Sequence, residues 1–281
     1  MESLKAIKRL LTIDEVNHGY HVLCGLYPHI PPMIIWRGWE YAAYQHYTLE
    51  EPVLDIGCGD GLFFRLVWPH IRDVVGMDVD SVIAEAARNS GVYREVYVAP
   101  AYDSPFESGR FASVFANCSL EHMDHLSEVF RHISHCLRPG GKFLFSVVTN
   151  KFLEWAMLPL LLRVVGESER AKFLQFSYLE YHHLINFFSP EDWAKQLSKA
   201  NFVVEDYIPI VPEVTARVFL FLDNLWHVPS GSGELGDVLP EIFASWLNFG
   251  SGLEQILLGF LHLERDWTTC GGAVFCARKS I

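Results

Sequence analysis

Short apolar runs alternate with amphipathic stretches through the first half of the chain. Strong runs occupy residues 52–56, 73–78, 112–117 and 142–149, and a weaker one occupies 95–99. Continuous apolar runs of this kind, rather than runs alternating with polar residues, are typical of parallel strands buried on both faces. Because helix-like stretches separate the runs, and such crossovers are right-handed, the pattern predicts a doubly wound α/β sheet.

The regular alternation ends with the last of these runs. The following stretch is helical and aromatic, and Ser189 with Pro190 then marks the start of a helix. Two more strands are predicted at 202–210 and 271–279, which completes a sheet of seven. The predicted organisation is a sheet domain built from 51–149, 189–210 and 271–281, with helical additions at 1–50, 150–188 and 211–270.

The charge of the chain narrows the classes of partner. Its 281 residues include 34 acidic and 22 basic side chains, a formal net charge of −12. A general binder of nucleic-acid backbones needs a basic surface, so no nucleic-acid partner is expected. An aromatic content of 14% with only 20% charged residues excludes intrinsic disorder and fits a large core, a large apolar pocket, or both.

Cysteine usage and apolar stretches bear on localisation. The six cysteines are scattered without a CxxC pair, as is typical of reduced intracellular thiols. Residues 1–20 lack the apolar centre of a signal peptide. The apolar stretch 152–166 contains Glu154, Pro159 and Arg163, and is shorter than the roughly 20 residues that span a bilayer. We therefore expect a cytoplasmic protein without stable membrane insertion; contact of 152–166 with a membrane surface is the lesser alternative.

A glycine-rich segment, VLDIGCGDG at 53–61, is the most informative part of the chain. It follows a predicted strand and opens a predicted helix, where backbone N–H groups are free and glycines permit close approach of a ligand. Ligands of open α/β sheets bind at such turns. The third glycine of a dinucleotide fingerprint is replaced by Leu62, and Asp55 precedes the first glycine. This acid suits a cationic ligand better than a pyrophosphate.

The segment resembles the first motif of the class I S-adenosylmethionine (SAM)-dependent methyltransferases, (V/L)LD(I/V)GCGxG. Four further matches follow in the family's order: GMDVD at 76–80, SPF at 104–106 with GRFA at 109–112, LEHM at 120–123 and LRPGG at 137–141. The resemblance implies a Rossmann-like sheet of seven strands with the last strand antiparallel. It also implies methyltransferase activity, with SAM as cofactor and S-adenosyl-L-homocysteine as its product.

The resemblance assigns cofactor contacts to particular positions. Asp78 matches the ribose-binding acid and lies about 20 residues after the glycine loop. The acid that often lies near the adenine amine is replaced by Pro100, so we expect backbone groups of Ala101 and Tyr102, with packing against Val79, to hold the adenine. The complete set of expected cofactor-binding residues is Arg37, Asp55, Gly57, Cys58, Gly59, Asp78, Val79, Ala101, Tyr102 and Asn117.

Two flanking segments resemble a subset of the family that acts in cell-surface glycan and natural-product biosynthesis. IWRGWE at 35–40 is similar to its W(W/Y)xxR helix, and HLINFFS at 183–189 to its HxRxFS segment, with Asn186 in place of arginine. In these proteins the N-terminal helices cover the cofactor. Arg37 could then pair with the methionine carboxylate, or it could be a surface residue that anchors the lid.

The chemistry needs a general base only when the acceptor keeps its proton. Methyl transfer is a displacement that depends mainly on alignment, but a phenol of pKa about 10 gains from a nearby histidine. The candidates are His122, past the fourth strand, His183, in the first insertion beside His182, and Tyr20, in the N-terminal lid. Each has a structural alternative. No metal site is expected: histidine spacing on 125–135 falls on a helix outside the sheet.

The aromatic residues concentrate in the lid and in both insertions, which leave the sheet where they can cover its carboxyl edge. Much of this content must form the cores of these additions, but the cover favours an apolar pocket. We therefore expect a largely apolar or aromatic small-molecule acceptor, methylated at oxygen. The alternatives are a protein or nucleic-acid methyltransferase, and a non-catalytic SAM-binding partner subunit. Formation of a homodimer is left open.

Overall fold

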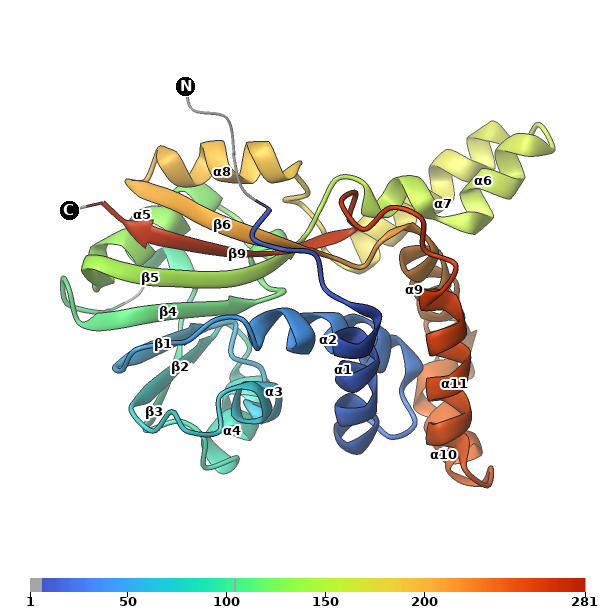
Figure 1. The fold of residues 1–281 in the computed structure, drawn as a ribbon, viewed down its shortest axis with the longest axis horizontal. Helices are drawn as coiled ribbons and strands as arrows, with labels where there is room; N and C mark the ends of the chain where they lie inside the picture. Colours follow the sequence, from blue (N-terminus) through green and yellow to red (C-terminus); the bar gives the residue numbers. More distant parts are fainter. Residues whose placement is uncertain (1–6, 104, 281) are drawn as a thin grey trace.

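The structure is a computed structural model that describes residues 7–103 and 105–280 (Figure 1). Its sheet has seven strands in the order β3-β2-β1-β4-β5-β9-β6, and β9 runs antiparallel to both of its neighbours. The strands are β1 Val53–Ile56, β2 Val74–Asp78, β3 Glu95–Val98, β4 Phe111–Asn117, β5 Leu137–Val148, β6 Phe202–Ile210 and β9 Gly272–Lys279. This order confirms the predicted doubly wound sheet with an antiparallel last strand.

Successive residues of the central strands enter two different cores, because side chains alternate across a strand. Val53 of β1 packs in the core that includes Phe64, while its neighbour Leu54 packs in the core that includes Phe130 and Trp193. Both strand residues are fully buried, which explains the continuous apolar runs in the sequence. The helices that connect and cover the strands are α3 Leu62–Val67, α4 Ser81–Asn89, α5 Leu126–Cys136 and α8 Pro190–Ser198.

The Pro-Gly-Gly sequence at 139–141 lies within strand β5. β5 begins at Leu137, which pairs with Phe111, and the register then shifts before Ser113 pairs with Lys142. The shift accommodates the intervening residues as an irregularity in the ladder, so the Pro-Gly-Gly sequence bends the strand without ending it.

Two helices precede the sheet, α1 Ile13–Leu26 and α2 Pro31–Tyr44. Thr12 and Glu15 form a capping box at the start of α1. The two helices cross at Gly19 and Gly38, where a Cβ on Gly19 would overlap the carbonyl oxygen of Gly38. The glycines therefore permit a close approach that a larger residue would prevent.

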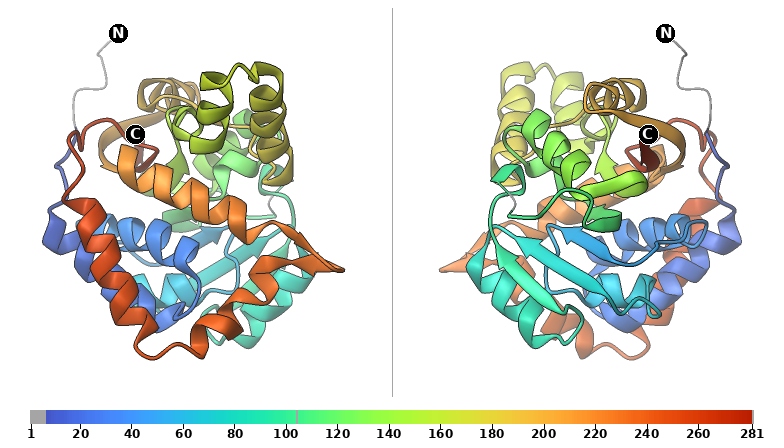
Figure 2. Two further views of the ribbon diagram at one scale, coloured as in Figure 1. Left: turned by 90° about the vertical axis from the view of Figure 1, so that its right-hand side faces the viewer. Right: turned by 90° about the vertical axis from the view of Figure 1, so that its left-hand side faces the viewer.

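The helical additions gather at the carboxyl edge of the parallel strands, on the right of Figure 1. Figure 2 shows them from that side, with the N-terminal helices among them. Within them, α9 packs against α2, α6 and α11. The additions after the sheet comprise η3 Phe152–Trp155, α6 Met157–Val164, α7 Ser168–Tyr181, α9 Glu213–Trp226, the hairpin β7 Pro229–Ser230 and β8 Gly233–Glu234, η4 Leu235–Asp237, α10 Leu239–Ala244 and α11 Phe249–Leu261. None of the helices in the described ranges has the length and apolar character needed to span a bilayer.

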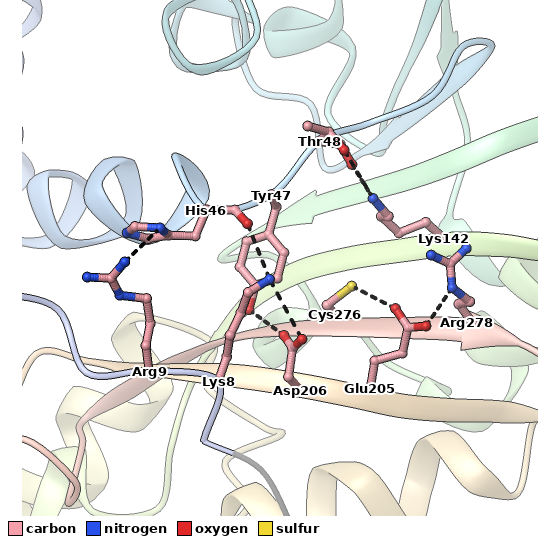
Figure 3. A network of polar contacts seen from close by, with 10 residues as sticks. All are labelled: Lys8, Arg9, His46, Tyr47, Thr48, Lys142, Glu205, Asp206, Cys276 and Arg278. Carbon is pink, nitrogen blue, oxygen red and sulfur yellow. Dashed lines mark hydrogen bonds and ion pairs between the residues drawn. The ribbon is translucent and has the colours of Figure 1, made fainter.

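The N-terminal segment is fastened to the sheet through an irregularity in β6 (Figure 3). The ladder between β6 and β9 shifts register between Val204 and Asp206, a bulge that brings Glu205 and Asp206 to the same side. Tyr47 donates a hydrogen bond of 2.8 Å to Asp206, and Lys8 lies 3.7 Å from the same carboxylate. Lys8 also donates its backbone N–H to Tyr207, so both the segment that leads into the first helix and Tyr47, which follows α2, are held against the edge strand.

Candidate functional site

The glycine loop after β1 adopts a backbone shape that needs its glycines. Gly57, Gly59 and Gly61 have φ angles of 67°, 57° and 80°. A Cβ on Gly57 would lie 2.6 Å from Ser119, and one on Gly61 would lie 2.5 Å from the ring of Tyr93. A Cβ on Gly59 would meet nothing within 4 Å, so the loop is packed at two glycines and open at the third. The open position leaves backbone atoms accessible to a ligand.

Asp78, at the carboxyl end of β2, lies beside this loop. Its carboxylate accepts hydrogen bonds from the backbone N–H of Gly59 at 3.2 Å and of Asp80 at 3.0 Å. One donor belongs to the glycine loop after β1, and the other belongs to the turn that follows β2. The bonds hold the carboxylate at the mouth of a cavity, where it can accept further hydrogen bonds.

This first cavity has a volume of about 390 Å³. Five of the expected cofactor residues line it: Gly57, Asp78, Val79, Ala101 and Tyr102. Val79 is 70% exposed and Tyr102 is 38% exposed although both have large apolar surfaces. A flat apolar ligand placed between them would remove this surface from water.

Asp55 belongs to strand β1, just before the glycine loop, and does not line the first cavity. It is buried and accepts a hydrogen bond of 2.6 Å from the phenol of Tyr93. Burial, together with the nearby negative charge of Asp78, raises the pKa of Asp55 to about 7, despite the hydrogen bond from Tyr93. The site thus contains an acid that can change charge near neutral pH.

The remaining expected cofactor residues lie close to the first cavity without lining it. Cys58 is packed in the core, where burial raises the pKa of its thiol. Asn117 accepts a hydrogen bond of 3.2 Å from Ser146. Gly59 presents backbone, and its N–H is already bonded to Asp78. Direct contact of these residues with the cofactor stays a prediction.

A second cavity, of about 160 Å³, adjoins the first, and Cys118 and His122 line both. Its apolar wall comes from helices far apart in the sequence: Met33 and Trp36 of α2, Phe152 of η3, Tyr178 of α7 and Phe219 of α9. Its polar wall consists of Arg37, Glu121, His182 and Asp223. Apolar and aromatic side chains with a few convergent polar groups are typical of the lining of a small-molecule site.

Arg37 belongs to this second cavity and has a buried partner. It donates a hydrogen bond of 2.7 Å to Glu40, whose carboxylate also accepts from Trp36 at 3.1 Å and from Ser146 at 2.6 Å. Burial opposes the charge of Arg37, but the adjacent Glu40 outweighs it and raises the pKa of the guanidinium. The hydrogen bond to Glu40 uses one nitrogen of the guanidinium, Nη1. Contact of the other nitrogens with a methionine carboxylate stays a prediction.

The three expected catalytic residues occupy different positions. Nδ1 of His122 lies 3.3 Å from the carbonyl oxygen of His183, at the junction of the two cavities. His183 lines the first cavity only. Tyr20 lines neither cavity: it is buried where α1 crosses α2, and it accepts a hydrogen bond of 2.9 Å from Trp39. Tyr20 is therefore a core residue in this structure, and its burial raises the pKa of the phenol.

Sequence reasoning missed a polar cluster at the wall of the second cavity. Nε2 of His182 lies 3.1 Å from Asp223, and Nε2 of His227 lies 3.5 Å from the other oxygen of the same carboxylate. Nδ1 of His227 contacts Glu234 at 2.7 Å. The pKa of His227 rises to about 9, because contacts with Asp223 and Glu234 outweigh its partial burial. The only sequence signal is the spacing of Asp223 and His227 by four residues, one turn of a predicted helix.

Comparisons with known proteins agree with this geometry. The family profile described as a methyltransferase domain matches residues 27–207. Demethylmenaquinone methyltransferase of Symbiobacterium thermophilum is 25% identical over 194 residues, which cover 61% of this chain and 77% of that protein. Ubiquinone biosynthesis O-methyltransferase of Xanthomonas axonopodis is 30% identical over 172 residues, which cover 59% of this chain and 69% of that protein.

A solved structure shares the fold over nearly the whole chain. It is that of a SAM-dependent methyltransferase from Thermotoga maritima, described as a possible histamine N-methyltransferase. The TM-score is 0.54 at 16% identity, and the match covers 95% of this chain and 99% of that one. The similarity at this identity concerns the fold, including the additions outside the sheet.

Proposed function

The chain belongs to the class I SAM-dependent methyltransferases, and on this basis we propose that its two adjoining cavities hold the methyl donor and a small methyl acceptor. The observation that carries the proposal is the pair of cavities that share Cys118 and His122. Their shared wall is where a donor and an acceptor would meet. When bound, SAM would supply an electrophilic methyl group on a sulfonium, with S-adenosyl-L-homocysteine as the leaving group.

In the first cavity, the proposed contacts use a carboxylate that can accept further hydrogen bonds and backbone that a ligand can reach. Asp78 accepts hydrogen bonds from the ribose hydroxyls, and the open backbone at Gly59 lets the rest of the donor approach closely. Val79 and Tyr102 flank the adenine. The negative charge of Asp78, which also raises the pKa of the nearby Asp55, favours a donor that carries positive charge.

For the second cavity we propose a largely apolar or aromatic small molecule, methylated at oxygen, from specialised-metabolite or surface-glycan biosynthesis. The rings of Trp36, Phe152 and Phe219 support an apolar acceptor. The names of the two relatives above, a demethylmenaquinone methyltransferase and a ubiquinone-biosynthesis O-methyltransferase, support a small acceptor and, in one case, oxygen. In this role the cavity walls align the acceptor, and His122 at the junction can take its proton.

Titration calorimetry with SAM tests the donor site. Asp78→Asn keeps the shape but removes a charged acceptor, and should weaken SAM binding about 10- to 100-fold. Asp73→Asn is the matched control: it makes the same change of charge just before β2, at the end away from the cavity, and should leave binding unchanged. Absence of SAM binding by the unsubstituted protein would overturn the proposal. It would also exclude the alternative of a non-catalytic subunit that binds SAM.

Transfer of a tritiated methyl group from SAM tests the acceptor class. The panel would contain apolar phenols, including hydroxylated quinone precursors, beside sugar phosphates, transfer RNA and a protein extract. We expect label in the apolar phenols, recovered as methyl ethers. Label confined to RNA or protein would instead support the alternative macromolecular acceptors.

A further inference from the structure

Three side chains from two helices converge on one point at the wall of the second cavity. His182 follows α7, Asp223 lies in the last turn of α9, and His227 is the residue that follows α9. One nitrogen of each imidazole and one carboxylate oxygen all lie within 4.8 Å of one another. His182 and Asp223 face the cavity, whereas His227 does not line it.

We propose that His182, Asp223 and His227 bind one divalent transition-metal ion. Two histidines and a carboxylate are a common ligand set for zinc and for ferrous iron, and three protein ligands leave coordination positions open. Because two of the ligands line the second cavity, an open position would face a bound acceptor. That last point rests on the proposed function, whereas the metal site itself does not.

The distances fit an ion placed between the three groups. Ligand atoms at about 2.0–2.2 Å from one ion, in tetrahedral or octahedral geometry, are about 3–3.5 Å apart. The imidazole of His182 lies 3.1 Å from one oxygen of Asp223, and that of His227 lies 3.5 Å from the other oxygen. One ligand atom from each residue makes a set within 4.8 Å, so side-chain rotations that draw the three atoms closer together would complete the coordination.

The groups behind the ligands have the arrangement that supports a metal. Histidine ligands commonly donate their second ring nitrogen to a carboxylate, which fixes the ring and strengthens the ligand. Nδ1 of His227 meets Glu234 in this way at 2.7 Å, so Nε2 is directed toward Asp223. Tyr178 donates a hydrogen bond of 2.8 Å to Asp223. This bond goes to the carboxylate oxygen that also faces His182, so Tyr178 helps to fix the orientation of the buried carboxylate.

The charges of the cluster also fit a divalent cation. Asp223 and Glu234 bring two negative charges to a partly buried place, and Tyr178 and Tyr181 bring hydroxyl groups but no compensating charge. In the metal-free protein, protonation of the two histidines would offset this negative charge. A divalent ion would replace these protons, so its affinity should increase with pH.

The test uses the full-length protein, stripped with EDTA, and the metal alone. Cobalt(II) titrated into it at pH 7.5 should give visible d–d absorption that saturates at one equivalent, and calorimetry with Zn²⁺ should show one site. His227→Gln and His182→Gln should each weaken Zn²⁺ binding more than about 100-fold, and Glu234→Gln about 10- to 100-fold. His21→Gln is the control, since His21 contacts Glu254 at 3.2 Å in an exposed pair outside the cluster.

Circular dichroism of each variant shows whether it folds, and SAM binding shows whether the donor site is intact. Saturation at one equivalent that is lost in folded, SAM-binding His227→Gln supports the metal site. Binding of Zn²⁺ that is absent, or equal in the unsubstituted protein and both histidine variants, overturns it and makes the cluster an ion-pair network between α7 and α9. Either result leaves the proposed methyl transfer unaffected, because that is measured by SAM binding and label transfer.

Discussion

The phenol of Tyr93 fills the space beside two glycines and donates a 2.6 Å hydrogen bond to the buried Asp55. A Cβ on Gly61 would lie 2.5 Å from its ring, and one on Gly76 would lie 3.1 Å from it. One side chain therefore supports the glycine loop, the neighbouring strand and the acid that precedes the loop.

Asp55→Asn should change how stability depends on pH. The native pKa of about 7 lies above the unfolded value of 3.8, so the native state holds a proton that the unfolded state has released between these values. The free energy of unfolding therefore falls as pH rises through this window, by at most about 4 kcal/mol. Asparagine mimics the neutral acid and should flatten the slope. Urea unfolding from pH 5 to 8 measures it; equal slopes in both proteins would contradict the assigned pKa.

Gly61→Ala should destabilise the protein for two separable reasons. The residue has a φ of 80°, and its new methyl group would collide with the ring of Tyr93. Gly91→Ala is the matched control, since its φ is 69° but a Cβ there meets nothing within 4 Å. We expect a loss of about 1 kcal/mol for Gly91→Ala and a further 1–3 kcal/mol, roughly, for Gly61→Ala. Equal losses in urea unfolding would show that the collision with Tyr93 relaxes without cost.

His227→Gln should remove a second dependence of stability on pH, in a higher pH range than that of Asp55. The native pKa of about 9 exceeds the usual 6.5, so the stabilisation from protonated His227 is complete below pH 6.5 and disappears as pH rises through 9. In EDTA, the melting temperature of the unsubstituted protein should fall between pH 7 and 9, and that of the variant should fall less. Because His227 is partly exposed, the difference is expected to shrink in high salt.

Tyr47→Phe should loosen the N-terminal segment. The mostly buried Tyr47 donates to the carboxylate of Asp206, and loss of a hydrogen bond to a charged group costs about 1.5–3 kcal/mol. Tyr97→Phe is the control, because Tyr97 donates at 2.7 Å to Glu95 in an exposed pair and its loss should cost little. Hydrogen exchange at Lys8, whose N–H bonds to Tyr207, should accelerate in Tyr47→Phe alone. Unchanged exchange there would place the attachment elsewhere.

The sequence was sufficient to predict which residues meet at the first cavity, whereas their contact with the cofactor stays a prediction. Gly57, Asp78 and Ala101 each follow or end a strand of the sheet, and the carboxyl ends of parallel strands meet at one edge. A pattern that predicts the strands therefore also predicts that these residues converge. The motifs of the family resemblance lie in the same turns.

The wall of the second cavity could not be predicted in this way. His182 and Asp223 come from separate helical additions, and their contact depends on how α7 and α9 pack over the sheet. Helical periodicity gives the buried face of each helix but not its rotation against another helix. For the same reason Tyr20 was predicted at the site, although it lies in the packing between α1 and α2.

The close crossing of α1 and α2 links a residue outside the proposed acceptor cavity to the width of that cavity. Gly19 lies outside both cavities, but a larger residue there would push Gly38 away, and with it the turn of α2 that carries Trp36 and Arg37. The width of the proposed acceptor cavity is thus determined by helix spacing as well as by its own walls. Directed evolution toward bulkier or smaller acceptors could therefore succeed at a residue that never contacts them.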